Sequence, residues 1–154
     1  KIKETILFYK FISKNINRPT QLSIVTPHTK YINDLLCKTD QKRYSIEILS
    51  LEPSKVSEYL RNCDFGFLFR EKSIVNKVAS PVKFLEYTSN GVIPIISDEI
   101  GDYSSDVENR KLGICLKNYS QIDHSVIDKL NQLLKDSSLF QRVFTYSSNF
   151  LWQK

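Results

Sequence analysis

Glycine is scarce in this sequence, with four residues among 154. No Gly-x-Gly-x-x-Gly run follows a predicted strand, and no Gly-x-x-x-x-Gly-Lys segment is present. Those patterns place backbone amides against the phosphates of dinucleotides and nucleoside triphosphates. The Gly-x-Ser-x-Gly elbow of the serine hydrolases is also absent. The sequence therefore excludes a dinucleotide fingerprint, a Walker loop and a nucleophile elbow.

Cysteine and histidine are also few. The three cysteines and two histidines are widely separated, without the paired spacing that zinc or dithiol chemistry needs. We expect buried thiols in a reducing compartment, and neither a bound metal nor another cofactor.

Long apolar runs are missing, and so is an apolar signal core near the start. The net charge of +5 is spread along the chain and admits an anionic ligand or a negatively charged membrane surface. Without a basic-aromatic block it predicts no nucleic-acid partner. Methionine is absent and the first residues are predicted to be helical, so we expect a domain excised from a longer protein.

What the sequence does contain is an alternation of strand and helix patterns, of a length that fits one domain. The predicted strands cover residues 21–26, 44–51, 65–69, 92–97 and 112–117. Helical spacing covers residues 2–15, 31–36, 53–63, 81–90, 124–135 and 137–152. Residues 98–110 are predicted to form a loop, with a short helix inside it as the alternative. This rhythm predicts an α/β fold, doubly wound, with a mainly parallel sheet and helices on both faces.

The segment 70–91 carries the candidate site. Arg70 ends a strand, and after a polar loop Ser80 and Pro81 suit the cap and first position of a helix that Gly91 closes. Lys83 lies in the first turn, where the helix dipole disfavours a cation. A bound anion would remove that conflict.

Glu86 lies on the same predicted helix face as Lys83, together with Tyr87, while Val82, Phe84 and Leu85 are expected to point toward the sheet. A phosphate at the helix amino end and sugar hydroxyls at the carboxylate suit this face. The alternative interpretation is a capped surface helix with one weak Lys–Glu pair. In a parallel sheet ligands bind beyond the carboxyl ends of the strands, and the segment lies at that edge.

Three runs carry a family resemblance: Asp64-Phe-Gly-Phe-Leu-Phe-Arg-Glu, Val78-Ala-Ser-Pro-Val-Lys-Phe-Leu-Glu-Tyr and Gly91-Val-Ile-Pro-Ile-Ile-Ser-Asp. In this order they resemble the donor-binding half of nucleotide-sugar glycosyltransferases of family 4, which have the GT-B fold. The likeness is specific over residues 56–103, and elsewhere it rests on the order of elements. The resemblance implies a Rossmann-like half of a GT-B enzyme.

The resemblance also implies roles for individual residues. Ser80 and Pro81 would present the helix amino end to the donor diphosphate, with Lys83 near the same charges. Glu86 would bind the ribose hydroxyls. Arg70 and Asn76 would contact the diphosphate or the sugar.

The sequence departs from the family pattern at Val78, where the family often has a glutamate that touches the donor sugar. The basic pair usual near the start of the donor half is not identifiable, and the acceptor-binding half is absent. The resemblance implies a retaining glycosyltransferase of glycan biosynthesis, with no required metal, that transfers a sugar from a nucleotide-diphosphate donor to an acceptor hydroxyl. Its partners would be that donor and an N-terminal acceptor-binding domain.

The enzyme is expected in the cytoplasm, and the resemblance admits its association with the inner face of the membrane. The isolated domain is expected to transfer nothing. The alternative is a non-catalytic α/β binding or interaction domain that kept the fold.

Overall fold

The computed structural model describes residues 1–36, 42–71, 73–74, 82–98, 100–118 and 122–150. Helices and strands alternate in the order α1 (Ile2–Asn15), β1 (Leu22–Val25), α2 (Thr29–Leu35), β2 (Ile46–Leu49), α4 (Pro53–Leu60), β3 (Phe65–Leu68), α6 (Val82–Ser89), β4 (Ile93–Ser97), α7 (Tyr103–Asn109), β5 (Ile114–Leu116), α8 (His124–Lys135) and α9 (Leu139–Ser148). The predicted α/β fold is confirmed. The predicted loop 98–110 contains a short helix, α7, which is the alternative that the sequence left open.

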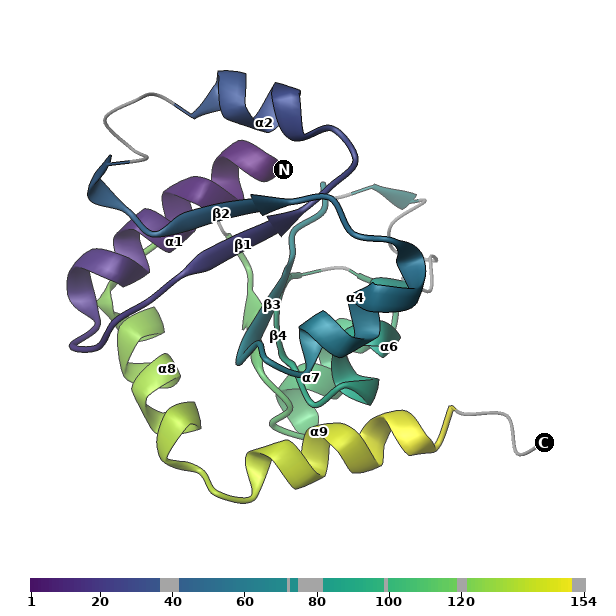
Figure 1. Ribbon diagram of the computed structural model, residues 1–154. Coiled ribbons are helices and arrows are strands. Elements are labelled where there is room, and N and C mark those ends of the chain that lie inside the picture. The colour runs from purple at the N-terminus through teal and green to yellow at the C-terminus, as the bar shows by residue number, and fades with distance from the viewer. Residues whose placement is uncertain (37–41, 72, 75–81, 99, 119–121, 151–154) are drawn as a thin grey trace.

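All the described strand pairs are parallel, and they form two separate sheets (Figure 1). One sheet has the order β1-β2 and the other has the order β3-β4-β5. The sequence pattern predicts a parallel sheet but not this division, which depends on long-range pairing.

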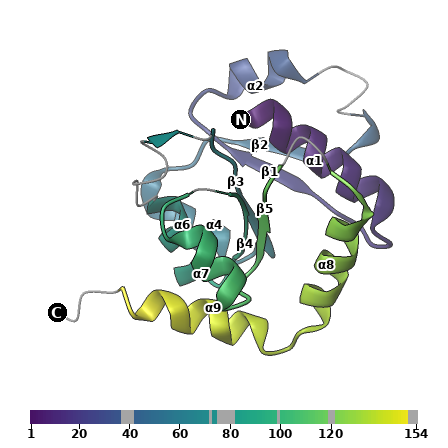
Figure 2. The same cartoon turned by 180° about the vertical axis from the view of Figure 1, so that it is seen from behind.

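Helix α1 covers one face of both sheets. Its Ile6 and Tyr9 pack with Leu22 of β1, and its Phe8 meets the Phe67 ring edge-on at 5.6 Å between centroids. Helix α8 packs beside it, as Figure 2 shows from behind. α1 therefore joins the two halves of the fold.

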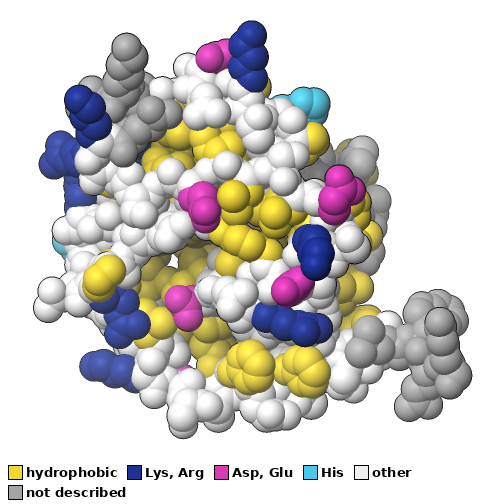
Figure 3. Space-filling view, viewed as in Figure 1, with side chains coloured by type: hydrophobic (Ala, Val, Ile, Leu, Met, Phe, Trp, Pro, Cys, Tyr) yellow, Lys and Arg dark blue, Asp and Glu magenta, His cyan; other side chains and the backbone are white. Residues whose placement is uncertain are grey.

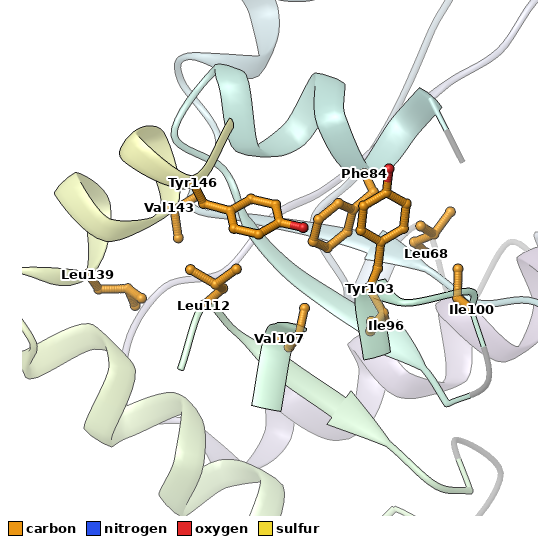
Figure 4. Packing of buried hydrophobic residues seen from close by; sticks show 10 residues of the cluster. All are labelled: Leu68, Phe84, Ile96, Ile100, Tyr103, Val107, Leu112, Leu139, Val143 and Tyr146. Carbon is orange, nitrogen blue, oxygen red and sulfur yellow. The ribbon is translucent and has the colours of Figure 1, made fainter. Parts of the chain in front are cut away.

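Helices α6, α7 and α9 pack together on the opposite face. Phe84 of α6 is fully buried and stacks on Tyr103 of α7, with ring centroids 4.3 Å apart (Figure 4). The Tyr146 ring of α9 meets the Phe84 ring edge-on, with the two ring centroids 5.9 Å apart. β4 is buried between the two helical layers, because Ile95 belongs to the core on the α1 side and Ile96 to the core on the α6 side. Helices on both faces confirm the doubly wound arrangement.

Helix α9 leaves part of its aromatic surface uncovered. Phe140 and Phe144 are 59% and 45% exposed, and hydrophobic side chains are visible along α9 in Figure 3. No helix in the described ranges combines the length and the apolar character needed to cross a bilayer.

Gly91 closes α6 as predicted, with φ at +76°. We expect Gly91→Ala to lower the free energy of unfolding by about 1–2 kcal/mol from the backbone conformation alone, measured by urea unfolding. A Cβ there would also overlap the Phe140 ring, which adds to the loss. In a Phe140→Ala background the substitution should cost less, and an unchanged unfolding midpoint for Gly91→Ala would contradict this account.

Candidate functional site

The candidate site lies where β3 and β4 end. Arg70 is two residues past the end of β3, and Ser97 is the last residue of β4. α6 connects these parallel strands, so its amino end faces the same edge of the sheet. Of the predicted site residues, Arg70, Lys83 and Glu86 are described, whereas Asn76, Ser80 and Pro81 lie outside the described residues, as does Val78.

Two contacts of Tyr87 fix α6 against the sheet. The Tyr87 ring lies over Gly66 of β3, where a Cβ would come within 2.6 Å of the ring. The Tyr87 hydroxyl donates a hydrogen bond of 3.2 Å to the Phe67 carbonyl. The helix is therefore held in one rotational setting.

That setting corrects two orientation predictions. Val82 was expected to point toward the sheet but is 68% exposed, whereas Phe84 and the half-buried Leu85 do pack against the core. Tyr87 was expected on the exposed face with Lys83 and Glu86 but lies half-buried on β3. The helix packs through the stripe that begins at Phe84 and continues one turn later through Tyr87, and Val82 lies off that stripe.

Lys83 and Glu86 are both exposed on α6. Among the described residues, neither side chain has a hydrogen bond or an ion pair, and the two do not pair with each other. The Lys83–Glu86 pair that the alternative interpretation expects is therefore not formed, and an ordinary surface helix stays the alternative to a ligand site. Both charges face solvent, where a ligand can reach them.

A serine that the sequence reasoning did not select positions Arg70. The Arg70 backbone amide donates to Ser97 Oγ at 2.9 Å, and the same hydroxyl donates to the Arg70 carbonyl at 3.2 Å. Ser97 is only 2% exposed. This pair of bonds connects Arg70 to the end of β4. A polar residue that closes an apolar strand is the only signal for it in the sequence.

The charge of the next residue, Glu71, is balanced by Lys1 at the start of α1. Its carboxylate forms an ion pair with Lys1, with 2.7 Å between Lys1 Nζ and Glu71 Oε1. Lys1 Nζ also lies 3.2 Å from Glu4 Oε1. The hydrogen bond from Lys1 lowers the pKa of the Glu71 carboxyl. The contact places the amino end of α1 at the carboxyl end of β3.

Burial raises the pKa of the Tyr87 hydroxyl from 10.0 to about 12, and the nearby Glu86 charge adds to the shift. Since the folded state holds this proton more tightly than the unfolded state, stability is retained below pH 10 and lost as the pH rises toward 12. Between pH 10 and 12 we expect the free energy of unfolding of wild type to fall by up to about 2–3 kcal/mol more than that of Tyr87→Phe. Urea unfolding at pH 9 and 11.5 measures the difference. Equal losses in the two proteins would contradict the assignment.

Other polar features lie away from this edge of the sheet. A pocket of about 410 Å³ lies beside the start of β5, and its lining includes Lys111, Lys129 and Arg142. Arg142 is already paired there with Asp136 at 2.7 Å. In the described part of the chain no His, Cys, Asp or Glu group could hold a metal ion.

The cysteines were expected to be buried. Cys63 and Cys115 are free thiols but only half-buried, and burial raises the pKa of Cys115 to about 11. Such a thiol is protonated near neutral pH, which makes it a poor nucleophile. Cys37 lies outside the described residues.

The edge of the sheet thus combines a helix amino end with an exposed cation and, one turn further, an exposed carboxylate. The helix end and Lys83 suit an anion, and Glu86 suits hydroxyl donors near that anion. Neither the known protein-family models nor the curated proteins include a match to this chain.

Proposed function

We propose that this chain is the nucleotide-sugar-binding domain of a retaining glycosyltransferase, which transfers a sugar from a nucleotide-diphosphate donor to an acceptor hydroxyl. The observation that carries the proposal is the unpaired state of Lys83 and Glu86 on a helix fixed at the carboxyl edge of a parallel sheet. The resemblance of residues 56–103 to family 4 glycosyltransferases supports it.

In this proposal the diphosphate binds at the amino end of α6. Ser80 and Pro81, which precede Val82 in the sequence, would present the amino end of α6, and its first amides and Lys83 neutralise the phosphates. Glu86 accepts hydrogen bonds from the ribose hydroxyls, one turn further along. Arg70 and Asn76 contact the diphosphate or the sugar.

The chemistry of the proposed transfer follows from those charges. As the bond between the sugar and the diphosphate breaks, negative charge grows on the leaving diphosphate, and groups already oriented toward it lower the barrier. The acceptor hydroxyl attacks the same carbon with retention of its configuration. An acceptor-binding domain supplies the other half of the cleft, and the enzyme works in the cytoplasm or at the inner face of the membrane.

The competing proposal is a non-catalytic domain of the same fold, favoured by Val78 in place of the glutamate that contacts the donor sugar. The two proposals differ in ligand binding, because only the first requires affinity for nucleoside diphosphates.

We expect Lys83→Ala to weaken nucleoside diphosphate binding roughly tenfold, the value of one charge-assisted hydrogen bond. Isothermal titration with uridine, guanosine, adenosine and cytidine diphosphates measures this. Lys55→Ala is the matched control, because Lys55 is an exposed lysine on α4 that already pairs with Glu58 at 3.3 Å. The proposal fails if none of the diphosphates binds wild type at millimolar concentration, or if both variants weaken binding equally.

A further inference from the structure

The pocket beside β5 lies at the opposite edge of the sheet from the candidate diphosphate site. Its lining includes Gly113, directly before β5, whereas α6 has its amino end beyond the carboxyl ends of β3 and β4. Residues of α7, α8 and α9 complete the lining, and Figure 2 shows these three helices around the start of β5. The volume of about 410 Å³ is within the range of about 300–1,000 Å³ that small-molecule sites occupy. The pocket can therefore hold a ligand of its own.

The buried residues that line this pocket are apolar. Val107 of α7 is fully buried, Ile114 of β5 is buried, and Leu133 of α8 is half-buried. The half-buried Cys115 thiol is uncharged near neutral pH, because burial raises its pKa to about 11. These residues suit the apolar body of a ligand.

The exposed residues of the lining carry charge. Lys111 and Lys129 have no side-chain hydrogen bond or ion pair in the part of the chain that the structure describes, and the same is true of Glu108. Arg142 and Asp136 balance each other at 2.7 Å. Two cations therefore remain against one carboxylate, and the pocket keeps one net positive charge.

Arg142 fixes one wall of the pocket. Its Nη1 donates to Ser138 Oγ, and its Nη2 donates to Asp136 Oδ2 at 2.7 Å and to the Lys111 carbonyl at 3.3 Å. These bonds connect α9 to the segment between α7 and β5. Because the lining is held in place before a ligand arrives, binding loses little conformational freedom.

The backbone conformation of Lys111 is unusual for a lysine. Its φ is +52°, in the left-handed region that glycine adopts most readily where a helix ends. The Leu112 amide donates to the Val107 carbonyl at 3.0 Å and closes α7 around this residue. A glycine at position 111 would suit this turn at least as well, so the turn itself does not require the cation.

We propose that this pocket binds a small organic monoanion, with a single carboxylate carried on an apolar body. The carboxylate binds Lys111 and Lys129, and the apolar body packs on the buried lining. A second negative charge on the ligand would be repelled by Glu108, which distinguishes this ligand from a nucleoside diphosphate. The site shares no residue with α6, so it does not depend on the function proposed above.

Titration of the 154-residue chain with benzoate and with naphthoate, followed through amide NMR shifts, tests the proposal. The amides of Gly113, Cys115 and Gln132 should shift and approach saturation at millimolar concentration. The neutral analogues benzamide and naphthamide should bind at least about tenfold more weakly, because they lack the charge that the lysines attract. This comparison needs no variant.

Replacing both lysines, Lys111→Gly with Lys129→Ala, should weaken carboxylate binding at least about tenfold. Glycine suits the backbone at position 111, so the loss should come without a lower urea midpoint. Lys135→Ala is the matched control, because Lys135 is an exposed lysine of α8 outside the lining. It should bind both carboxylates as wild type does.

The proposal is overturned if neither carboxylate shifts the three amides of the lining, or if the neutral analogues bind equally well. Unchanged affinity in the double variant, or an equal loss in Lys135→Ala, would also overturn it. Shifts confined to the exposed rings of Phe140 and Phe144 would assign binding to the surface of α9 and contradict the proposal. Lys83→Ala should leave carboxylate binding unchanged, so failure of the diphosphate site and failure of this pocket are distinguishable.

Discussion

Replacing Phe84 by alanine is expected to lower the free energy of unfolding by about 3–5 kcal/mol. The side chain is 0% exposed and stacks on Tyr103, while Tyr146 meets its ring edge-on. Its removal leaves a cavity among α6, α7 and α9, which would have to collapse together to fill it (Figure 4). Domains are stable by only about 5–15 kcal/mol, so this one change removes a large share of the total. Urea unfolding at neutral pH measures it.

Val82→Ala is the matched control for this prediction. Val82 lies on the same helix but is 68% exposed, so its truncation should change stability by no more than about 0.5 kcal/mol. If Phe84→Ala and Val82→Ala lower the free energy of unfolding by similar amounts, Phe84 is not the residue through which α6 packs against the core. The control also matters for the ligand site, because Phe84 holds the helix that carries Lys83 and Glu86.

Replacing Glu86 by alanine is expected to weaken nucleoside diphosphate binding by about 10–100-fold, since hydrogen bonds to a charged group are worth about 1.5–3 kcal/mol. One carboxylate can accept hydrogen bonds from both neighbouring hydroxyls of a ribose. In the described residues the Glu86 carboxylate has no hydrogen bond or ion pair of its own. Because Glu86 is exposed, the change should leave stability almost unaltered. Isothermal titration and urea unfolding of the same preparation separate the two effects.

Glu58→Ala provides the matched control for Glu86. Glu58 is an exposed glutamate on α4, paired with Lys55. Its neighbour Ser57 donates to Asn90 just past the carboxyl end of α6, which places Glu58 away from the amino end of that helix. Its removal should therefore leave diphosphate affinity unchanged. Weakened binding in this variant would mean that general surface charge, not the α6 site, attracts the ligand.

Local patterns predicted the elements well where the periodicity was strong. Helix α8 was predicted at residues 124–135 and spans His124–Lys135. Its apolar residues repeat at helical spacing, and Asp123 caps its start by accepting from the Ser125 amide at 2.9 Å. β4 was predicted as a strand buried on both faces, and both Ile95 and Ile96 are fully buried.

The errors arise where a contact joins distant parts of the chain. Over eight residues, spacing alone did not decide whether Val82 or Tyr87 faces the sheet, and the Tyr87–Gly66 contact settled it. The Lys1–Glu71 pair has no local sequence signal, and for the bonds between Ser97 and Arg70 the only signal is a polar residue at the end of an apolar strand. The division of the strands into two sheets likewise depends on contacts between distant parts of the chain, which local patterns do not predict.

The site itself was predictable in part. Sequence reasoning selected Lys83 and Glu86 from a conflict with the helix dipole and from their spacing, and the structure places both on the exposed side of α6 without partners. Their proposed ligand follows from the chemistry of the two charges together. The predicted contributions of Asn76, Ser80 and Pro81 stay predictions, because those residues lie outside the described ranges.

The central claim is that α6 binds a diphosphate with its amino end and a ribose with Glu86. The most direct test is to titrate wild type and Glu86→Ala with a ribonucleoside diphosphate and with its 2′,3′-dideoxy analogue. Wild type should prefer the ribose form by roughly tenfold or more, and the variant should bind both forms equally. Equal affinity of wild type for the two forms, or a preference that survives in Glu86→Ala, would contradict the claim.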